Sequence, residues 1–224
     1  MARWPYLFFD VGNTLLFPNR DRMLEPLSPA QRPTLEQWQA LERETKREFD
    51  AGMLNGSPDR GFWWNFHTRL LTERGLPLDG MRDTIVHNTQ QSANWDAILP
   101  GTREALQRIG QRHRLAVISN ADGRIYEVLA RCGIADCFET ITDSGIVGQE
   151  KPHPAVFQAA LRAMNAPAEQ SLYIGDVYSV DYLGAKNAGM DAVLMDVSRA
   201  YANREMARIE SLAELEGWLE QQKR

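Results

Sequence analysis

Three short apolar segments of the chain each end in residues that could do chemistry. Asp10 closes the run Tyr-Leu-Phe-Phe, Ser119-Asn120 follow Leu-Ala-Val-Ile, and Gly175-Asp176 follow Ser-Leu-Tyr-Ile. Taken singly, each has an ordinary explanation as a turn or a helix start. In an open parallel sheet, however, ligands bind outside the carboxyl ends of the strands. We therefore expect these polar residues, which are distant in sequence, to converge on one site.

The segments between these residues indicate how they are positioned. Continuous apolar runs at 6–10, 114–118, 171–176 and 192–195 are typical of strands buried on both faces of a parallel sheet. Helical patterns cover 102–109, 154–164, 180–188 and the tail from Ser211. Strands that alternate with helices predict a doubly wound α/β fold with a Rossmann-like parallel sheet.

Residues 18–95 interrupt this alternation and contain no convincing buried strand. Thr34-Leu35-Glu36-Gln37 is a capping box and predicts a helix that ends near Gly52. Ser57-Pro58 predicts the start of a second helix, running to Gly75, and a third is expected at about 79–93. We interpret 18–95 as a helical insertion, with 1–17 and 96–224 as the core.

Composition limits the possible partners. The 224 residues include 25 basic and 30 acidic side chains, a net charge of -5, and lack the basic stripe that nucleic acid binding requires. Two cysteines, Cys132 and Cys137, are too few for a disulfide framework. The N-terminal apolar run is too short for a signal peptide, and no other run approaches the ~18 residues of a membrane span. We expect a soluble, cytoplasmic protein without nucleic acid or membrane partners, of open oligomeric state.

Four motifs together resemble those of the haloacid dehalogenase superfamily. They are Asp10-Val11-Gly12-Asn13-Thr14-Leu15, then Ser119-Asn120, then Lys151-Pro152, and finally Gly175-Asp176 with Asp181. Each motif alone is weak, but four in the family's order and spacing are specific, and the resemblance covers nearly the whole chain. It implies that the insertion is a helical cap of the C1 type and that 1–17 and 96–224 form the catalytic core.

The resemblance also implies a phosphatase mechanism for a small phosphorylated metabolite. Asp10 is the expected nucleophile, because a carboxylate that attacks phosphorus splits one hard displacement into two easier steps. Mg²⁺ is the implied cofactor, held by Asp10, Asp176 and the carbonyl of Gly12, with Asp181 as a supporting carboxylate or an occasional ligand.

The remaining motif residues would handle the phosphoryl group. Lys151 would offset the repulsion between Asp10 and the phosphoryl oxygens. Ser119 and Asn120 would donate hydrogen bonds to those oxygens, where charge is located in the transition state. Thr14 is assigned to the same phosphate-binding set, with a role in orienting the first loop.

One position departs from the family pattern. Most phosphatases of this family carry an acid–base aspartate where this chain has Gly12, and such a group contributes about 10²–10⁴-fold. The substrate could have a good leaving group, such as an acyl or aryl phosphate. Alternatively, a cap residue could replace the missing acid, the candidates being His67, His87, Asp50 and Asp59.

Two further alternatives follow from Gly12. Phosphonoacetaldehyde hydrolases also carry a small residue there and use a cap lysine as a Schiff base; Lys46 is the only lysine of the insertion, although it is also placed to pair with Glu42 four residues earlier. The chain could instead bind phosphate with weak turnover.

The insertion also contains an unusually aromatic segment, 61–67, with the sequence Gly-Phe-Trp-Trp-Asn-Phe-His. Its rings could form internal packing or a lid over the substrate, and different rings could do each.

Overall fold

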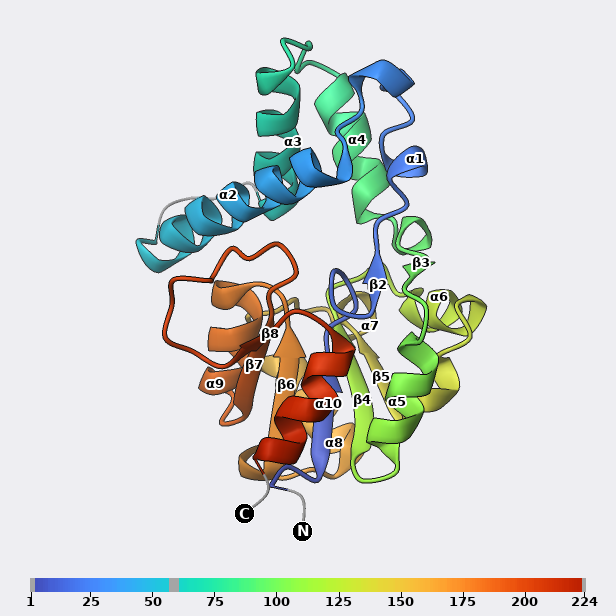
Figure 1. Cartoon of the computed structure of the whole chain (residues 1–224), viewed down its shortest axis with the longest axis vertical. Coiled ribbons are helices and arrows are strands. Elements are labelled where there is room, and N and C mark those ends of the chain that lie inside the picture. Colours follow the sequence, from blue (N-terminus) through green and yellow to red (C-terminus); the bar gives the residue numbers. More distant parts are fainter. Residues whose placement is uncertain (1–2, 57–60, 223–224) are drawn as a thin grey trace.

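The computed structural model describes residues 3–56 and 61–222. Its main sheet has six parallel strands in the order β5-β4-β1-β6-β7-β8 (Figure 1). The strands are β1 (Tyr6–Phe9), β4 (Arg114–Ser119), β5 (Thr140–Asp143), β6 (Ser171–Gly175), β7 (Asp191–Met195) and β8 (Arg208–Ile209). The four predicted strands are therefore confirmed as neighbours in one sheet, with β1 at its centre.

Apolar side chains on both faces of this sheet explain why it lies inside the protein. Leu7 and Phe9 of β1 join one buried cluster, whereas Phe8 between them joins a second cluster on the opposite face. Alternate residues of a strand point to opposite faces, so a continuous apolar run suits a sheet that is covered on both sides. The predicted doubly wound α/β fold is confirmed.

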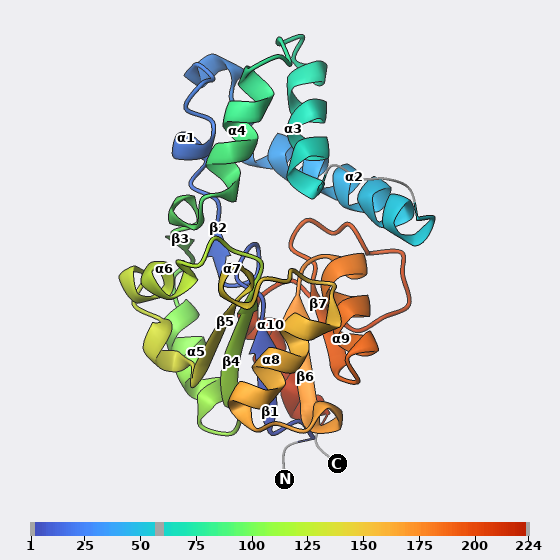
Figure 2. The same ribbon diagram turned by 180° about the vertical axis from the view of Figure 1, so that it is seen from behind.

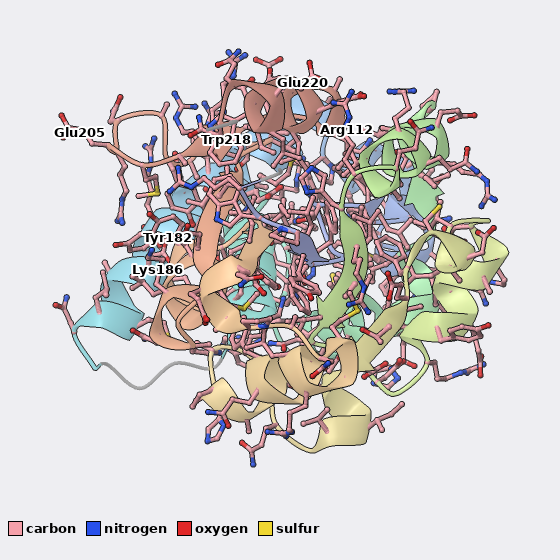
Figure 3. All side chains as sticks on the ribbon, turned by 90° about the horizontal axis from the view of Figure 1, so that it is seen from below. Arg112, Tyr182, Lys186, Glu205, Trp218 and Glu220 are labelled. Atoms are coloured by element: carbon pink, nitrogen blue, oxygen red, sulfur yellow. The ribbon has the colours of Figure 1, made fainter. Side chains whose placement is uncertain are left out.

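Two sets of helices cover these faces (Figures 1 and 2). The first cluster includes residues of α5 (Thr102–Gly110), α6 (Ile125–Arg131) and α10 (Leu212–Gln221), and the second includes residues of α8 (Pro154–Met164) and α9 (Leu183–Asn187). Trp218 of α10, labelled in Figure 3, stacks on Trp4 with 5.3 Å between ring centroids. This contact fixes the C-terminal helix beside the start of β1.

A helical segment leaves and re-enters this core through a small antiparallel ribbon, β2 (Leu16–Phe17) and β3 (Ala97–Ile98). It contains α1 (Arg20–Met23), α2 (Leu35–Leu54), α3 (Phe62–Glu73) and α4 (Met81–Gln90), and it lies beyond the carboxyl ends of the core strands (Figures 1 and 2). Its apolar cluster includes Trp38, Phe66 and Ile85. The predicted capping box at Thr34 is confirmed, since its side chain and that of Gln37 bond to each other's backbone N–H.

Several short elements complete the described chain. They are α7 (Ser144–Val147), a π-helix at Tyr178–Tyr182, and 3₁₀ turns at Pro29–Gln31, Ser92–Asn94, Ala135–Cys137 and Ala168–Gln170. The helix predicted over 180–188 is thus a π-helical turn followed by α9. The helix start predicted at Ser57-Pro58 lies outside the described residues, and α3 begins at Phe62. Among the described helices, none has the length and apolarity needed to span a membrane.

Candidate active site

The predicted residues converge because their strands are adjacent. Asp10 follows β1, Ser119 ends β4 and Asp176 follows β6, and both β4 and β6 pair with β1. These three side chains are buried at the wall of a cavity of about 580 Å³. From the four motifs, Asp10, Gly12, Ser119, Asn120, Lys151, Asp176 and Asp181 line this cavity. The helical segment forms its other wall.

Lys151 connects two of the predicted carboxylates. Its ammonium group lies 2.5 Å from Oδ1 of Asp10 and 2.8 Å from Oδ1 of Asp181, and it donates to the hydroxyl of Tyr173 at 2.7 Å. Burial lowers the pKa of Lys151, but Asp10 and Asp181 outweigh burial and raise it above its usual value. Lys151 therefore carries a permanent positive charge beside Asp10.

Asp181 is held on both of its oxygens. Oδ1 lies against Lys151, while Oδ2 accepts hydrogen bonds from the N–H groups of Asp176 at 3.1 Å and Val177 at 2.9 Å. This approach requires Gly175, because a Cβ there would lie 2.6 Å from both Cβ and Cγ of Asp181. Asp181 thus holds Lys151 through an ion pair and the backbone at Asp176 through hydrogen bonds.

Asp176 meets a residue from the helical segment. Lys46 of α2 lies 2.8 Å from Oδ2 of Asp176 and 2.8 Å from Oε1 of Glu42, with only 1% of its side chain exposed. Asn13 donates to the same Asp176 oxygen at 3.3 Å. The predicted Glu42–Lys46 pair is therefore present, and it extends across to the core.

This arrangement argues against Lys46 as a Schiff-base nucleophile. Burial lowers its pKa, but Asp176 and Glu42 more than offset burial and hold the pKa well above its usual value. A Schiff base needs the neutral amine. Lys46 is also absent from the described lining of the cavity, where a substrate would have to meet it.

The buried cluster has an excess of negative charge. Four carboxylates, those of Asp10, Asp176, Asp181 and Glu42, face the two ammonium groups of Lys46 and Lys151, which leaves a net charge of -2 when all are ionised. Burial, with the neighbouring carboxylates, raises the pKa of Asp10 to about 7 and that of Asp176 to about 6, although the lysines oppose this. Oxygens of Asp10, Asp176 and Asp181 lie within 4.8 Å of one another. A divalent cation would balance this charge.

The predicted phosphate-binding residues fall into two groups. Ser119 and Asn120 line the cavity, and the Asn120 side chain bonds to both the N–H and the carbonyl of Lys151, at 2.7 and 3.1 Å. Thr14 is buried and is not among the described lining residues. Its backbone N–H donates to the carbonyl of Val11 at 3.3 Å, in the tight turn that follows β1.

Three of the four residues suggested as substitute acids do not line the described cavity. His67 is buried, its Nε2 is 2.8 Å from the hydroxyl of Thr89, and burial lowers its pKa to about 3. Asp50 accepts from the N–H of Ser179 and the hydroxyl of Tyr201 at 2.9 and 2.8 Å. His87 is exposed, and none of these three lines the described cavity. Asp59 lies outside the described residues.

The aromatic segment divides between the two expected roles. Phe66 is fully buried in the apolar cluster of the helical segment. Phe62, Trp63 and Trp64 instead line the cavity, together with Phe49 and Trp95. Sequence reasoning missed Trp95, Tyr173 and the reach of Lys46 to Asp176. Only Tyr173 gives a signal in the sequence, because its hydroxyl is a polar group within the otherwise apolar run of β6.

Comparison with known proteins agrees with this architecture. The chain is 30% identical over 149 residues to haloacid dehalogenase-like hydrolase domain-containing protein 3 of Xenopus laevis, covering 64% of this chain and 61% of that protein. It is 38% identical over 97 residues to the glyceraldehyde 3-phosphate phosphatase of Pyrococcus abyssi, covering 42% of this chain and 41% of that protein. The chain thus spans less than two thirds of each of these relatives.

Solved structures share the fold at low sequence identity. YfnB of Bacillus subtilis, in a structure bound to magnesium, aligns with a TM-score of 0.70 and 22% identity, covering 97% of this chain and 99% of that one. The L-2-haloacid dehalogenase of Xanthobacter autotrophicus aligns with a TM-score of 0.65 and 17% identity, covering 98% and 100%. Residues 6–189 match the sequence profile of the haloacid dehalogenase-like hydrolases, and the chain belongs to this family of enzymes.

Proposed function

We propose that this hydrolase is a Mg²⁺-dependent phosphatase that cleaves a small phosphorylated metabolite through an aspartyl-phosphate on Asp10. The observation that carries the proposal is the position of Asp10. Lys151 holds its Oδ1, whereas its Oδ2 accepts no hydrogen bond from any residue that the structure describes. The side chain lies at the wall of the cavity and belongs to the acidic cluster with the excess negative charge. A carboxyl group that a lysine holds at the wall of a cavity is suited to act as a nucleophile.

Mg²⁺ would be held by Asp10, Asp176 and the carbonyl of Gly12, with Asp181 supporting the loop. When bound, it would supply positive charge that offsets the repulsion between Asp10 and a phosphate dianion. The donors are all oxygen atoms, which Mg²⁺ prefers. The charge excess of -2 equals the charge that one Mg²⁺ ion neutralises.

The chain's own residues would bind and orient the phosphoryl group. Lys151 would pair with a phosphoryl oxygen while it stays on Asp10. Ser119 would donate its hydroxyl and Asn120 its backbone N–H to the other oxygens, where the transition state gathers charge. The Asn120 side chain is occupied with the Lys151 backbone, so its role is to position that lysine.

We also propose that the chain is divided into two domains. Residues 1–17 and 96–224 would form the catalytic core, and 18–95 would form a cap that closes over the cavity. Contacts of α2 with the core support this, since Lys46 reaches Asp176 and Asp50 reaches Ser179 and Tyr201. A closed cap would exclude water from the phosphoryl group.

Two observations favour phosphate over halide chemistry for this site. The dehalogenases of this family do without a metal, whereas the buried cluster of this chain keeps a charge of -2 after Lys46 and Lys151 have paired with its carboxylates. The relatives include glyceraldehyde 3-phosphate phosphatases, among them those of Pyrococcus abyssi and Methanothermobacter thermautotrophicus. The alignments cover 41% and 42% of those proteins, and they support the reaction class rather than a particular substrate.

The test is phosphate release from a broad panel of phosphate esters, with Mg²⁺ or with EDTA. We expect turnover that depends on Mg²⁺ and is lost in Asp10→Asn. Phosphate binding without turnover, unchanged in Asp10→Asn, would assign the chain to a regulatory role instead. No binding and no turnover would reject the proposal.

A further inference from the structure

An indole ring lies directly against the position where a side chain at Gly12 would begin. A Cβ built on Gly12 would lie 3.3, 3.6 and 3.7 Å from three ring carbons of Trp95. Trp95 is fixed there, because its Nε1 donates to the carbonyl of Thr89 at 2.7 Å and its ring lies 5.2 Å from that of Trp63. Since its N–H is already used, Trp95 offers carbon rather than a proton at this position.

The other acids of the described wall are poorly suited to protonate a leaving group. Two carboxyl groups besides those of the acidic cluster line the cavity, Asp122 and Glu150. Asp122 is bonded through both oxygens to the hydroxyl and the N–H of Ser92. Glu150 is exposed to water. Among the described lining residues none is placed to protonate the leaving oxygen, so we expect it to depart as an anion, which selects a group that is stable with a negative charge.

The surroundings of that leaving group are aromatic and lack positive charge. Rings of Phe49, Phe62, Trp63, Trp64 and Trp95 line the cavity, and among the described lining residues Lys151 carries the only positive charge. Lys151 would already pair with Asp10 and a phosphoryl oxygen, so it would not be available to the leaving group. Stacked and edge-on rings favour a flat apolar guest, whereas a second anionic group would be desolvated here without a partner.

We propose that the substrate is a phosphate monoester of an uncharged phenol-type group, with Trp95 as the residue that selects it. This rests on the proposed phosphatase function. Asp10 forms the new bond to phosphorus, the bond from phosphorus to the aryl oxygen breaks, and its electron pair leaves on the phenolate. The phenolate takes a proton from water after release. Water then attacks the aspartyl phosphate, which returns Asp10 and inorganic phosphate.

The first test compares phenyl phosphate with benzyl phosphate on the wild-type enzyme with Mg²⁺. Both present the same ring, but phenol has a pKa of about 10, whereas an alcohol lies near water at about 16. We expect kcat/KM to be at least about 100-fold higher for phenyl phosphate, because no acid assists the alkoxide. Values within tenfold of each other would overturn the inference.

The second test varies charge at constant shape. 4-Carbamoylphenyl phosphate and 4-carboxyphenyl phosphate differ mainly by one negative charge, and we expect a lower KM for the carbamoyl ester. An equal or lower KM for the carboxylate would contradict the inference. Mg²⁺-dependent release from alkyl phosphates alone would reject the substrate class but keep the phosphatase function, whereas no release from any ester would reject both.

Discussion

Replacing Lys46 with methionine tests the most unusual contact of the structure. Methionine keeps much of the apolar length of lysine and removes only the charge. In Lys46→Met, the carboxylates of Asp176 and Glu42, both within 2.8 Å of the ammonium group, would remain buried without that partner. We therefore expect a large loss of stability in the absence of a divalent cation.

The size of the loss follows from the burial of the pair. Removing one partner of a buried ion pair destabilises a protein by about 3–5 kcal/mol. For a chain of this length, each kcal/mol shifts the Tm by about 2–4 °C. Lys46→Met is expected to melt roughly 6–20 °C below the wild type at pH 7.5 with EDTA. Circular dichroism or calorimetry measures this directly.

Two conditions should reduce the difference. Saturating Mg²⁺ supplies the missing positive charge and stabilises the variant more than the wild type. At pH 5 the carboxyl of Asp176, whose pKa burial raises to about 6, is protonated and no longer needs the lysine. The control is Lys186→Met, which removes an exposed ion pair to Asp191 and should change stability by less than about 0.5 kcal/mol (Lys186 is labelled in Figure 3). If the Tm of Lys46→Met in EDTA equals that of Lys186→Met, Lys46 is not the counter-ion of Asp176 and Glu42.

Three further predictions address the site. Burial raises the pKa of Asp176 above its unfolded value of 3.8, so without metal its contribution to stability is present below about pH 4 and is lost as the pH rises through about 6. The dependence of Tm on pH, measured in EDTA, should therefore be weaker in Asp176→Asn than in the wild type. An unchanged dependence would contradict the raised pKa. A Cβ at Gly12 would lie 3.3 Å from the Trp95 ring, so the double variant Gly12→Asp with Trp95→Ala should raise kcat/KM for benzyl phosphate more than for phenyl phosphate; equal effects on both would count against a missing acid. Gly175→Ala forces a clash with the neighbouring buried carboxylate and should lower stability by about 1–3 kcal/mol and reduce kcat. The control Gly217→Ala, inside α10 with nothing within 4 Å of the added carbon, should leave kcat unchanged and raise stability by about 0.5–1 kcal/mol.

The elements that could be predicted are those with a strong local signal. Each buried strand of the sheet centre is a continuous apolar run, and α8 begins at Pro154, which suits the first turn of a helix. The edge strand β5 was missed because its sequence Thr-Ile-Thr-Asp carries a single aliphatic residue. The two-residue strand β8 is too short to show any periodicity.

The candidate site divides in the same way. Asp10, Ser119 and Asp176 could be placed together because they end neighbouring strands of one sheet. Lys46 and Trp95 belong to the helical segment, and their contacts depend on how that segment packs over the core. No local pattern encodes that packing, which is why the structure was needed to show an indole at Gly12 and an ammonium group at Asp176.

Covalent catalysis by Asp10 is the central claim, and rapid quenching of phenyl phosphate turnover with Mg²⁺ tests it most directly. Because no acid–base group stands at Gly12, water attacks the aspartyl phosphate slowly and the intermediate accumulates. We predict a burst of about one phenol per site, with one phosphoryl group on the peptide that contains Asp10 and none in Asp10→Asn. Steady release of phosphate without a burst and without phosphorylated Asp10 would contradict the account.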